Sequence, residues 1–199
     1  MFTNNTYILA SSSKSRYNIL KNSGFEFKKI SPKCDEEEFK KTIRAEKLSP
    51  KRIAIRLSYE KAMSISRLKK YFKNKVIGCD TLIHLNKKIF DKAKTLKEAQ
   101  NKIKTLSGRK HKIVSGITVC KGAKVIWQCS ATTNVKIRKL TDNEIKEYLK
   151  VAGKEVLHSV GCYQIEGLGP KIIEDIEGDF FNVMGLPLFK FLKYTYSNI

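Results

Sequence analysis

The N-terminal segment combines an apolar run with a helical spacing of apolar residues. Thr6 to Ala10 is a short apolar run that predicts a buried strand, and the polar cluster Ser11-Ser12-Ser13 follows it. A helix is predicted next, with Ile19 and Leu20 on its apolar side and Gly24 as its stop. The segment therefore predicts a strand, a short loop and a helix.

A second helix has the clearest start in the chain. Ser49-Pro50 has the form of an N-cap followed by proline at the first helical position. The apolar spacing then predicts a helix of roughly five turns, ending near residues 67–70. Residues 75–85 read as a strand, which Asn86-Lys87 turns back through Ile89 and Phe90.

Two capping boxes mark further helices. Thr95-x-x-Glu98 predicts a helix that ends at Ser107-Gly108, and Thr141-x-x-Glu144 predicts another that ends at Gly153. In each motif, the threonine side chain and the acidic side chain satisfy backbone N–H groups that the first helical turn leaves unpaired.

The remaining segments complete an α/β pattern. Residues 111–120 and 124–137 predict two long strands that form a hairpin around Lys121-Gly122. Residues 160–183 are glycine-punctuated strand and loop, and Gly185-Leu186-Pro187 leads into a C-terminal helix. We therefore predict an α/β protein with a mixed sheet.

Composition limits the domain count and the cellular location. The 199 residues are 41% hydrophobic, which allows one substantial core and predicts a single domain over residues 1–199. No uncharged apolar run approaches the ~20 residues that span a bilayer, and residues 1–5 lack a signal-peptide pattern. The five cysteines are odd in number and form no C-x-x-C pair. We expect a cytoplasmic protein with no membrane partner.

The net charge of +21 raises nucleic-acid binding as a rival function. The lysines are scattered through nearly every predicted element, without a basic stripe interleaved with aromatic residues. This distribution is typical of solvated surfaces, so no specific nucleic acid is expected. A non-catalytic basic module that binds nucleic acid stays open as an alternative.

The loop after the first strand has the chemistry of a phosphate site. A small-residue loop at a helix N-terminus presents backbone N–H groups and a positive dipole end to an anion. Ser11 and Ser13 suit such a site, and Arg16 lies in the first helical turn beside them. Taken alone, Arg16 is more often explained as a surface arginine than as a phosphate ligand.

Two charged residues stand on otherwise apolar elements. Lys61 lies in the middle of the apolar stripe of the long helix, where it either extends outwards or points into a cleft toward an anion. Asp80 ends the apolar run Val76–Cys79, a position typical of site carboxylates. Asp80 is also compatible with a turn cap or a partner for a lysine.

Together these residues supply what a nucleotide-cleaving enzyme needs. Such an enzyme uses carboxylate oxygens for a hard divalent cation, a base for water, and cations for the phosphates. The histidines have no metal-binding spacing, and neither a P-loop nor a Gly-x-Ser-x-Gly motif occurs. The candidates are Asp80, Glu36, Lys61, Lys92 and Arg16.

Ordered motifs from Ile8 to about Leu192 resemble those of the Maf family. They are Ile8-Leu9-Ala10-Ser11-Ser12-Ser13-x-x-Arg16, Asp35-Glu36, Glu60-Lys61-Ala62, Ile77-Gly78-Cys79-Asp80-Thr81, Asp91-Lys92, Leu106-Ser107-Gly108-x-x-His111, Gly161-x-Tyr163-x-x-Glu166-Gly167-x-Gly169, Glu177-Gly178-Asp179-Phe180 and Gly185-Leu186-Pro187-Leu188. Several matches in order are far more specific than any single motif.

The resemblance implies a fold, a reaction and residue roles. It implies two α/β lobes flanking a deep nucleotide-binding cleft, a Maf/ITPase-like arrangement, often as a homodimer. It also implies hydrolysis of a nucleoside triphosphate to a monophosphate and pyrophosphate. Asp80 matches the family's proton acceptor and Glu36 its partner at a Mg²⁺ or Mn²⁺ site, while Lys61, Lys92 and Arg16 match phosphate-binding residues.

Three positions resemble the family's specificity determinants: Ser15, Thr81 and Glu166. The dTTP/UTP-cleaving branch has Pro-Arg-Arg where this chain has Lys14-Ser15-Arg16, and glutamine where it has Glu166. These differences favour 7-methyl-GTP or another modified nucleotide, or a third branch of the family. Ala93 also replaces the proline that normally follows Lys92, which predicts a looser turn there. A division-related regulatory protein that retains a nucleotide pocket is a further alternative.

Overall fold

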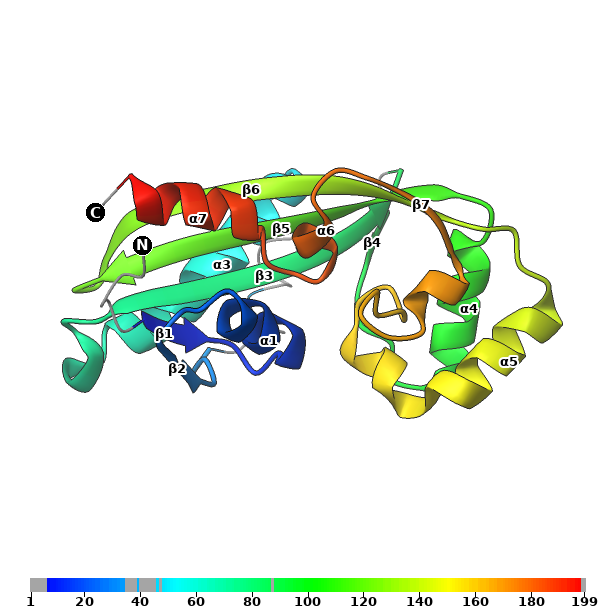
Figure 1. Ribbon diagram of the computed structural model, residues 1–199, viewed down its shortest axis with the longest axis horizontal. Coiled ribbons are helices and arrows are strands. Elements are labelled where there is room, and N and C mark those ends of the chain that lie inside the picture. Colours follow the sequence, from blue (N-terminus) through cyan, green and yellow to red (C-terminus); the bar gives the residue numbers. More distant parts are fainter. Residues whose placement is uncertain (1–6, 35–38, 40–45, 47, 87, 198–199) are drawn as a thin grey trace. The chain divides into compact units, whose positions relative to one another are not determined.

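The computed structural model describes residues 7–34, 39, 46, 48–86 and 88–197 (Figure 1). The chain divides into two compact units. Unit 1 contains the described residues of 1–81, 115–131 and 185–199, and unit 2 contains those of 82–114 and 132–184. The single domain predicted over residues 1–199 stays a prediction.

The described residues form a mixed sheet of seven strands. The strands are β1 (Tyr7–Ala10), β2 (Phe27–Ile30), β3 (Lys75–Leu85), β4 (Lys88–Phe90), β5 (Lys110–Lys121), β6 (Lys124–Ile137) and β7 (Ile173–Glu177). Their order is β2-β1-β3-β5-β6-β7, with β4 paired to β3. β1 is parallel to β2 and β3, whereas β4 and β7 are antiparallel to their neighbours. The predicted α/β class with a mixed sheet is confirmed.

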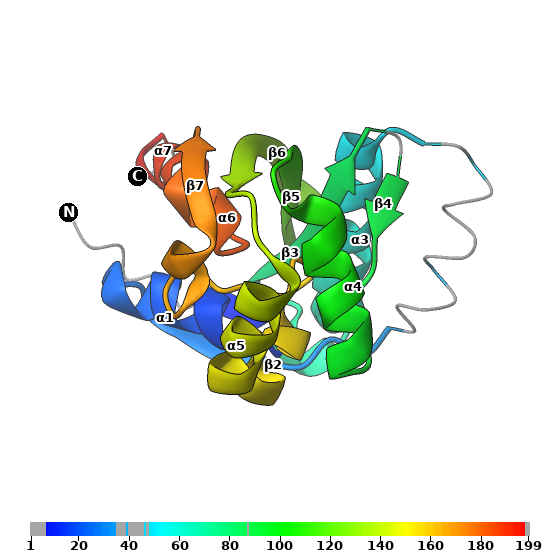
Figure 2. The same ribbon diagram turned by 90° about the vertical axis from the view of Figure 1, so that its right-hand side faces the viewer.

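Helices cover both faces of the sheet in unit 1. They are α1 (Lys14–Asn22), α3 (Pro50–Ser66) and α7 (Leu188–Tyr196), with a short 3-10 turn at Lys69–Tyr71. Figures 1 and 2 show α1 and α7 on one face and α3 on the other. α7 packs through aromatic rings: Phe191 lies edge-on to Tyr7 at 5.6 Å between centroids, and Tyr194 stacks on Trp127 at 4.7 Å.

Two glycines bring α3 unusually close to the sheet. A β-carbon at Gly78 on β3 would lie 2.1 Å from the Ser58 carbonyl oxygen, and one at Gly116 on β5 would lie 2.3 Å from the Ala54 carbonyl oxygen. The Ser58 and Thr118 hydroxyls add a hydrogen bond of 2.7 Å between α3 and β5. The helix backbone therefore rests directly on the strands at these points.

Unit 2 contains helices and short turns around its own apolar core. The helical elements are α4 (Leu96–Leu106), α5 (Asp142–Ala152), α6 (Phe180–Val183) and the 3-10 turns η2 (Gly153–His158) and η3 (Gly169–Lys171). Ile103, Leu106, Ile113 and Ile145 are among the buried residues of this core. Apolar residues of α4 and α5 thus face the same core, as their amphipathic patterns predict.

The two predicted capping boxes differ in geometry. At α5 the box is reciprocal: the Thr141 hydroxyl accepts from the Glu144 N–H, and the Glu144 carboxylate accepts from the Thr141 N–H. At α4 the Thr95 hydroxyl accepts from the Glu98 N–H, but the Glu98 carboxylate accepts from Lys94 instead of Thr95. Both helices begin where the motifs predicted.

The structure differs from the predicted pattern of elements in two places. The turn between β5 and β6 is centred on Gly122 and Ala123, whose φ values of 58° and 57° match a type I′ hairpin, one residue later than predicted. β2, with its two central lysines exposed, was not predicted. Within the described residues, no helix is long and apolar enough to cross a membrane.

Candidate functional site

The predicted site residues fall into three groups. Seven belong to unit 1: Ser11, Ser13, Ser15, Arg16, Lys61, Asp80 and Thr81. Lys92 and Glu166 belong to unit 2 and are exposed. Glu36, predicted as a metal ligand, lies outside the described residues.

Asp80 and Lys61 form a buried ion pair. Lys61 Nζ donates to Asp80 Oδ1 at 2.7 Å, and both side chains are less than a tenth exposed. Burying both charges away from water is favourable only when they are paired, so each side chain fixes the other. Lys61 therefore points inward to an anion and does not extend outwards. Asp80 is the partner of this lysine, which was one of the readings left open for it.

The close approach of α3 to β3 explains why this pair forms. Lys61 is one residue before Ala62, whose backbone nitrogen would lie 2.6 Å from a β-carbon at Gly78. Asp80 is two residues after Gly78, so its side chain emerges on the same face of β3, toward α3. Glycine at position 78 thus allows the lysine to reach the carboxylate.

Cys79 stands beside Asp80 on β3 and is fully buried. Burial raises the pKa of its thiol to about 12, although the nearby Arg16 and Lys61 charges partly oppose this shift. The thiol therefore stays protonated at neutral pH and is unsuited to nucleophilic attack. Asp80 itself lies in the middle of β3, not at the end of a strand as its place after the apolar run suggested.

Arg16 makes three hydrogen bonds inside unit 1. Its Nε donates to the Gly185 carbonyl at 2.8 Å, Nη1 to Ser11 Oγ at 3.3 Å and Nη2 to Thr81 Oγ1 at 3.0 Å. The residue is only 9% exposed. Arg16 is therefore not a simple surface arginine, because it ties the loop after β1 to β3 and to the turn before α7.

The serine loop is organised at the start of α1. Ser13 is the N-cap and accepts from the Arg16 N–H at 3.3 Å, while Ser11 Oγ accepts from the Ser13 N–H at 3.2 Å. Ser15 lies half-buried in the first turn. The two hydroxyls thus shape a loop at a helix N-terminus, the arrangement that favours an anion.

The candidate residues of unit 1 use opposite faces of β3. Asp80 points to α3, whereas Thr81 contacts Arg16 of α1, as the alternation of a strand requires. Thr81 Oγ1 also lies 2.9 Å from Ser115 Oγ and donates to the Gly185 carbonyl at 3.3 Å. Sequence reasoning missed Ser115, since a single serine inside an apolar strand carries no motif.

In unit 2, the segment that carries Lys92 is attached by several bonds. Lys102 of α4 donates to the carbonyl oxygens of Asp91 and Val160, the latter at 3.0 Å. The Ala93 N–H donates to the Cys162 sulfur, a bond that a proline at position 93 could not make. The looser turn predicted at Ala93 stays a prediction.

His111 and Tyr163 form a second buried polar pair in unit 2. His111 Nε2 lies 2.6 Å from the Tyr163 hydroxyl, and within the described residues Nδ1 is buried with no hydrogen-bond partner. Burial, with a smaller contribution from His84, lowers the pKa of His111 to about 4. His111 is therefore neutral at physiological pH and acts as a structural residue of the core.

We expect this histidine to make the protein acid-sensitive. In the unfolded state His111 has a pKa of 6.5 and is protonated below that pH. In the folded state its pKa is about 4, so it stays neutral until the pH falls to that value. The contribution of His111 to the free energy of unfolding is therefore fully present above pH 6.5. It decreases by about 3 kcal/mol as the pH falls to 4, at about 1.4 kcal/mol per pH unit. Urea unfolding of wild type and His111→Gln across this range measures the difference.

His158→Gln is the matched control, because His158 is exposed. The wild-type protein and His158→Gln are expected to lose stability in parallel, while His111→Gln loses about 3 kcal/mol less. Equal losses in all three proteins would show that His111 is not the group responsible.

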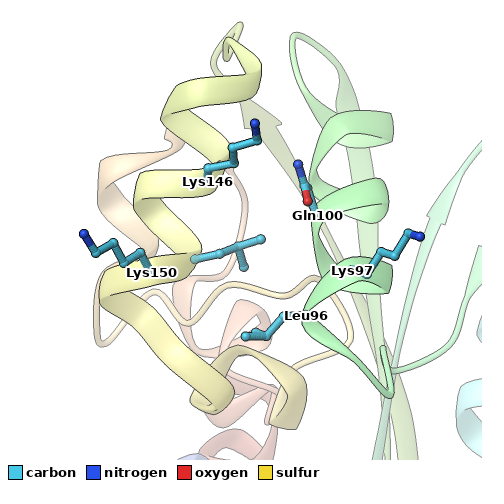
Figure 3. A pocket seen from close by; sticks show the side chains of 6 residues that line it. Leu96, Lys97, Gln100, Lys146 and Lys150 are labelled. Atoms are coloured by element: carbon cyan, nitrogen blue, oxygen red, sulfur yellow. The ribbon is translucent and has the colours of Figure 1, made fainter.

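A shallow groove lies between α4 and α5 in unit 2 (Figure 3). Leu96 and Leu149 supply apolar surface, and Lys146 and Gln100 extend toward one another across it. Lys97 and Lys150 point away from it. None of the predicted site residues lines this groove, so it is separate from the candidate chemistry.

Comparison with known proteins identifies the family that shares these sequence motifs. The family model described as Maf-like protein matches residues 6–197, nearly the whole chain. The chain belongs to the Maf-like family. This confirms the resemblance of the sequence motifs, which reach from the β1 strand to the α7 helix.

Relatives in the Maf-like family carry three different functional names. A protein of Hyphomonas neptunium named nucleoside triphosphate pyrophosphatase is 38% identical, over 94% of this chain and 92% of the relative. A protein of Rhizobium meliloti named 7-methyl-GTP pyrophosphatase is 36% identical over the same shares. A Clostridioides difficile protein named dTTP/UTP pyrophosphatase is 37% identical, over 91% of this chain and 89% of the relative. All three names describe a pyrophosphatase, but they differ in the nucleotide that they name.

Proposed function

We propose that this chain is a hydrolase that converts a nucleoside triphosphate and water to a nucleoside monophosphate and pyrophosphate. The observation that carries the proposal is the buried Asp80–Lys61 pair, in the same unit as the Arg16 network and the serine loop. A carboxylate, two cations and a helix N-terminus supply the groups that phosphoryl chemistry needs. The names of the relatives support the same reaction.

Asp80 is the proposed general base. It orients a water molecule and takes its proton as the water oxygen bonds to the α-phosphorus, and the bond from that phosphorus to the bridging oxygen breaks. Pyrophosphate leaves with the bridging oxygen. Lys61 holds the carboxylate in place through the 2.7 Å contact. Proximity and charge provide the catalysis, without a covalent intermediate on the protein.

The phosphates are assigned to the basic groups. Lys61, Lys92 and Arg16 are the proposed cations, and the loop containing Ser11 and Ser13 supplies backbone N–H groups at the start of α1. Among the described residues, three of the five Arg16 N–H groups donate to partners in unit 1, and we assign the other two to a phosphate. Its internal bonds hold the guanidinium ready before substrate binds.

The donor chemistry fits a hard divalent cation. Within the described part of the chain, no group of three or more His, Cys, Asp or Glu residues comes together as a metal site. Mg²⁺ usually takes one or two carboxylates and completes its coordination with water and substrate phosphates, so Asp80 with Glu36 is a sufficient protein contribution. Bound there, Mg²⁺ or Mn²⁺ would polarise the α-phosphoryl group.

The preferred base is proposed from the residues that differ between branches. Ser15, Thr81 and Glu166 are the proposed determinants, and Lys14-Ser15-Arg16 departs from the dTTP/UTP pattern. A modified or non-standard nucleotide such as 7-methyl-GTP is therefore the proposed substrate. Relatives named for 7-methyl-GTP at 36–37% identity support this choice, and the dTTP/UTP relative at 37% shows that identity alone does not decide it.

A nucleotide panel tests the proposal. Purified protein is incubated with Mg²⁺ or Mn²⁺ and 7-methyl-GTP, UTP, dTTP, CTP or the other common triphosphates, and products are separated by chromatography. We expect monophosphate and pyrophosphate, fastest from 7-methyl-GTP. If UTP and dTTP are cleaved fastest, the proposed substrate is wrong while the reaction stands. No cleavage by wild type with either metal would contradict the reaction itself.

The two alternative functions predict different binding and cleavage results for this protein. A basic nucleic-acid-binding module, motivated by the charge of +21, binds polyanions in a salt-sensitive manner without nucleotide cleavage. A division-related regulatory protein binds nucleotide without turnover. Several lysines are paired with surface carboxylates, such as Lys104 with Asp142 at 2.7 Å and Lys136 with Glu174 at 2.6 Å, which favours solvated faces over a nucleic-acid surface.

The proposed setting is the cytoplasm, with the enzyme working as a homodimer of the kind the family often forms. Cys79, Cys120 and Cys162 are buried thiols, which suits a reducing compartment. The deep cleft between two lobes is part of the family expectation and stays a prediction.

A further inference from the structure

Lys102 of α4 joins two segments of unit 2 that are far apart in the chain. Its ammonium group donates to the Asp91 carbonyl oxygen and, at 3.0 Å, to the Val160 carbonyl oxygen. Burial lowers the pKa of Lys102, because the surrounding protein displaces water that would solvate the charge. The two backbone oxygens therefore take the place of part of that water.

The chain just after Lys92 has anchors of its own. The Ala93 N–H donates to the sulfur of Cys162, and both of these residues are buried. The Lys94 N–H donates to Glu98 Oε2 of α4 at 2.8 Å. The segment that follows Lys92 is therefore attached both to the core of unit 2 and to α4.

Lys102 anchors the chain just before Lys92. The carbonyl group of Asp91 belongs to the planar peptide group that ends at the α-carbon of Lys92, so the bond from Lys102 fixes the plane from which that side chain starts. The second bond goes to Val160, whose side chain packs against the core of unit 2. Lys102 thus connects the backbone at Lys92 to a fixed point.

We propose that Lys102 is a positioning residue, which directs Lys92 toward the triphosphate and does not contact the substrate. The inference rests on the proposed function, because it takes Lys92 as a phosphate-binding cation. Two of the three hydrogens of the Lys102 ammonium go to backbone oxygens, so its charge acts through the chain. Without this anchor, binding would have to order the Lys92 side chain, which costs affinity.

Tripolyphosphate tests this role because it carries the phosphates of every candidate substrate without a base. Its affinity is measured by titration calorimetry in excess magnesium for wild type, Lys102→Met, Lys102→Arg, Lys92→Met and the double variant. We expect Lys102→Met to bind about 3- to 10-fold more weakly, a range that corresponds to the net contribution of one hydrogen bond. Lys102→Arg keeps a charged donor and is expected to bind more tightly than Lys102→Met.

The double variant shows whether Lys102 acts through Lys92. In the Lys92→Met background, Lys102→Met should weaken binding by less than about twofold, because the side chain that it positions is gone. Equal weakening in the presence and absence of Lys92 would mean that Lys102 binds phosphate directly or acts through another group. That result would overturn the proposal.

Lys104→Met is the matched control. Lys104 lies on the same helix and forms an exposed pair with Asp142 at 2.7 Å, so the variant removes the same charge without touching the Lys92 segment. Its tripolyphosphate affinity should stay within about twofold of wild type, because solvent and salt screen an exposed charge. Weakening equal to that of Lys102→Met would reduce the effect to lost charge on α4 and overturn the proposal.

Stoichiometry separates positioning from general destabilisation. A variant that is only partly folded binds fewer equivalents of tripolyphosphate with unchanged affinity, whereas a misdirected Lys92 lowers the affinity at unchanged stoichiometry. We expect the second result for Lys102→Met, and the first would overturn the proposal.

Nucleotide cleavage by wild type keeps this inference apart from the proposed function. A wild type that binds tripolyphosphate but cleaves no triphosphate of the panel would refute the hydrolysis, while the affinities of the variants still judge the role of Lys102. A wild type that binds no tripolyphosphate would overturn the inference, whether or not it cleaves nucleotides.

Discussion

Replacing Asp80 with asparagine is expected to lower kcat by about a thousandfold, within the range typical of a lost general base. The amide is nearly the same size as the carboxylate and still accepts from Lys61, so the contact now 2.7 Å long is kept in form. It cannot take a proton from water, and it binds a divalent cation weakly. Nucleotide affinity should therefore change much less than turnover.

The control for this variant is Asp142→Asn. Asp142 forms an exposed pair with Lys104, so the same chemical change there removes a charge without touching the candidate site. Steady-state kinetics and nucleotide titrations are compared for both variants and wild type, with melting curves to confirm folding. If Asp80→Asn turns over within threefold of wild type, Asp80 is not the base.

Gly78→Ala is expected to destabilise the protein by about 4 kcal/mol or more, the upper range for a single substitution. The new β-carbon would lie 2.1 Å from the Ser58 carbonyl oxygen and 2.6 Å from the Ala62 nitrogen. Both atoms belong to the backbone of α3, so no side-chain rotation relieves the overlap. The helix would have to move away from β3 and take Lys61 from Asp80.

Urea unfolding followed by circular dichroism measures this effect. Gly167→Ala is the matched control, since the nearest atom of the described residues, the Gln164 carbonyl oxygen, would lie 3.7 Å from its β-carbon. That variant should differ from wild type by less than about 1 kcal/mol. An unfolding midpoint for Gly78→Ala equal to that of Gly167→Ala would refute the close packing of α3 on β3.

The elements that the sequence predicted well have local causes. The start of α3 follows from Ser49, whose hydroxyl accepts from the Arg52 N–H, and from proline at the first turn. The reciprocal box at Thr141 likewise depends only on neighbouring residues. β2 has no such local signal: Phe27 and Ile30 are half-buried around two exposed lysines, and its pairing with β1 is decided by tertiary contacts.

In the candidate site too, the local sequence identifies residues, whereas the contacts between them depend on the tertiary structure. Asp80 and Lys61 were each identified from their positions on apolar elements, but their contact depends on how closely α3 approaches β3 at Gly78. Ser115 was not identified at all, because its importance arises only when β5 places it beside Thr81. Family motifs identified Arg16, and the structure adds that Arg16 also holds protein groups in place.

Hydrolysis in water enriched with oxygen-18 tests the central claim most directly. The preferred triphosphate is converted completely, and mass spectrometry locates the label in the two products. Water attacking the α-phosphorus, as proposed for Asp80, puts the label in the nucleoside monophosphate and leaves pyrophosphate unlabelled. Labelled pyrophosphate with unlabelled monophosphate, or release of inorganic phosphate and a nucleoside diphosphate, would contradict the proposed reaction.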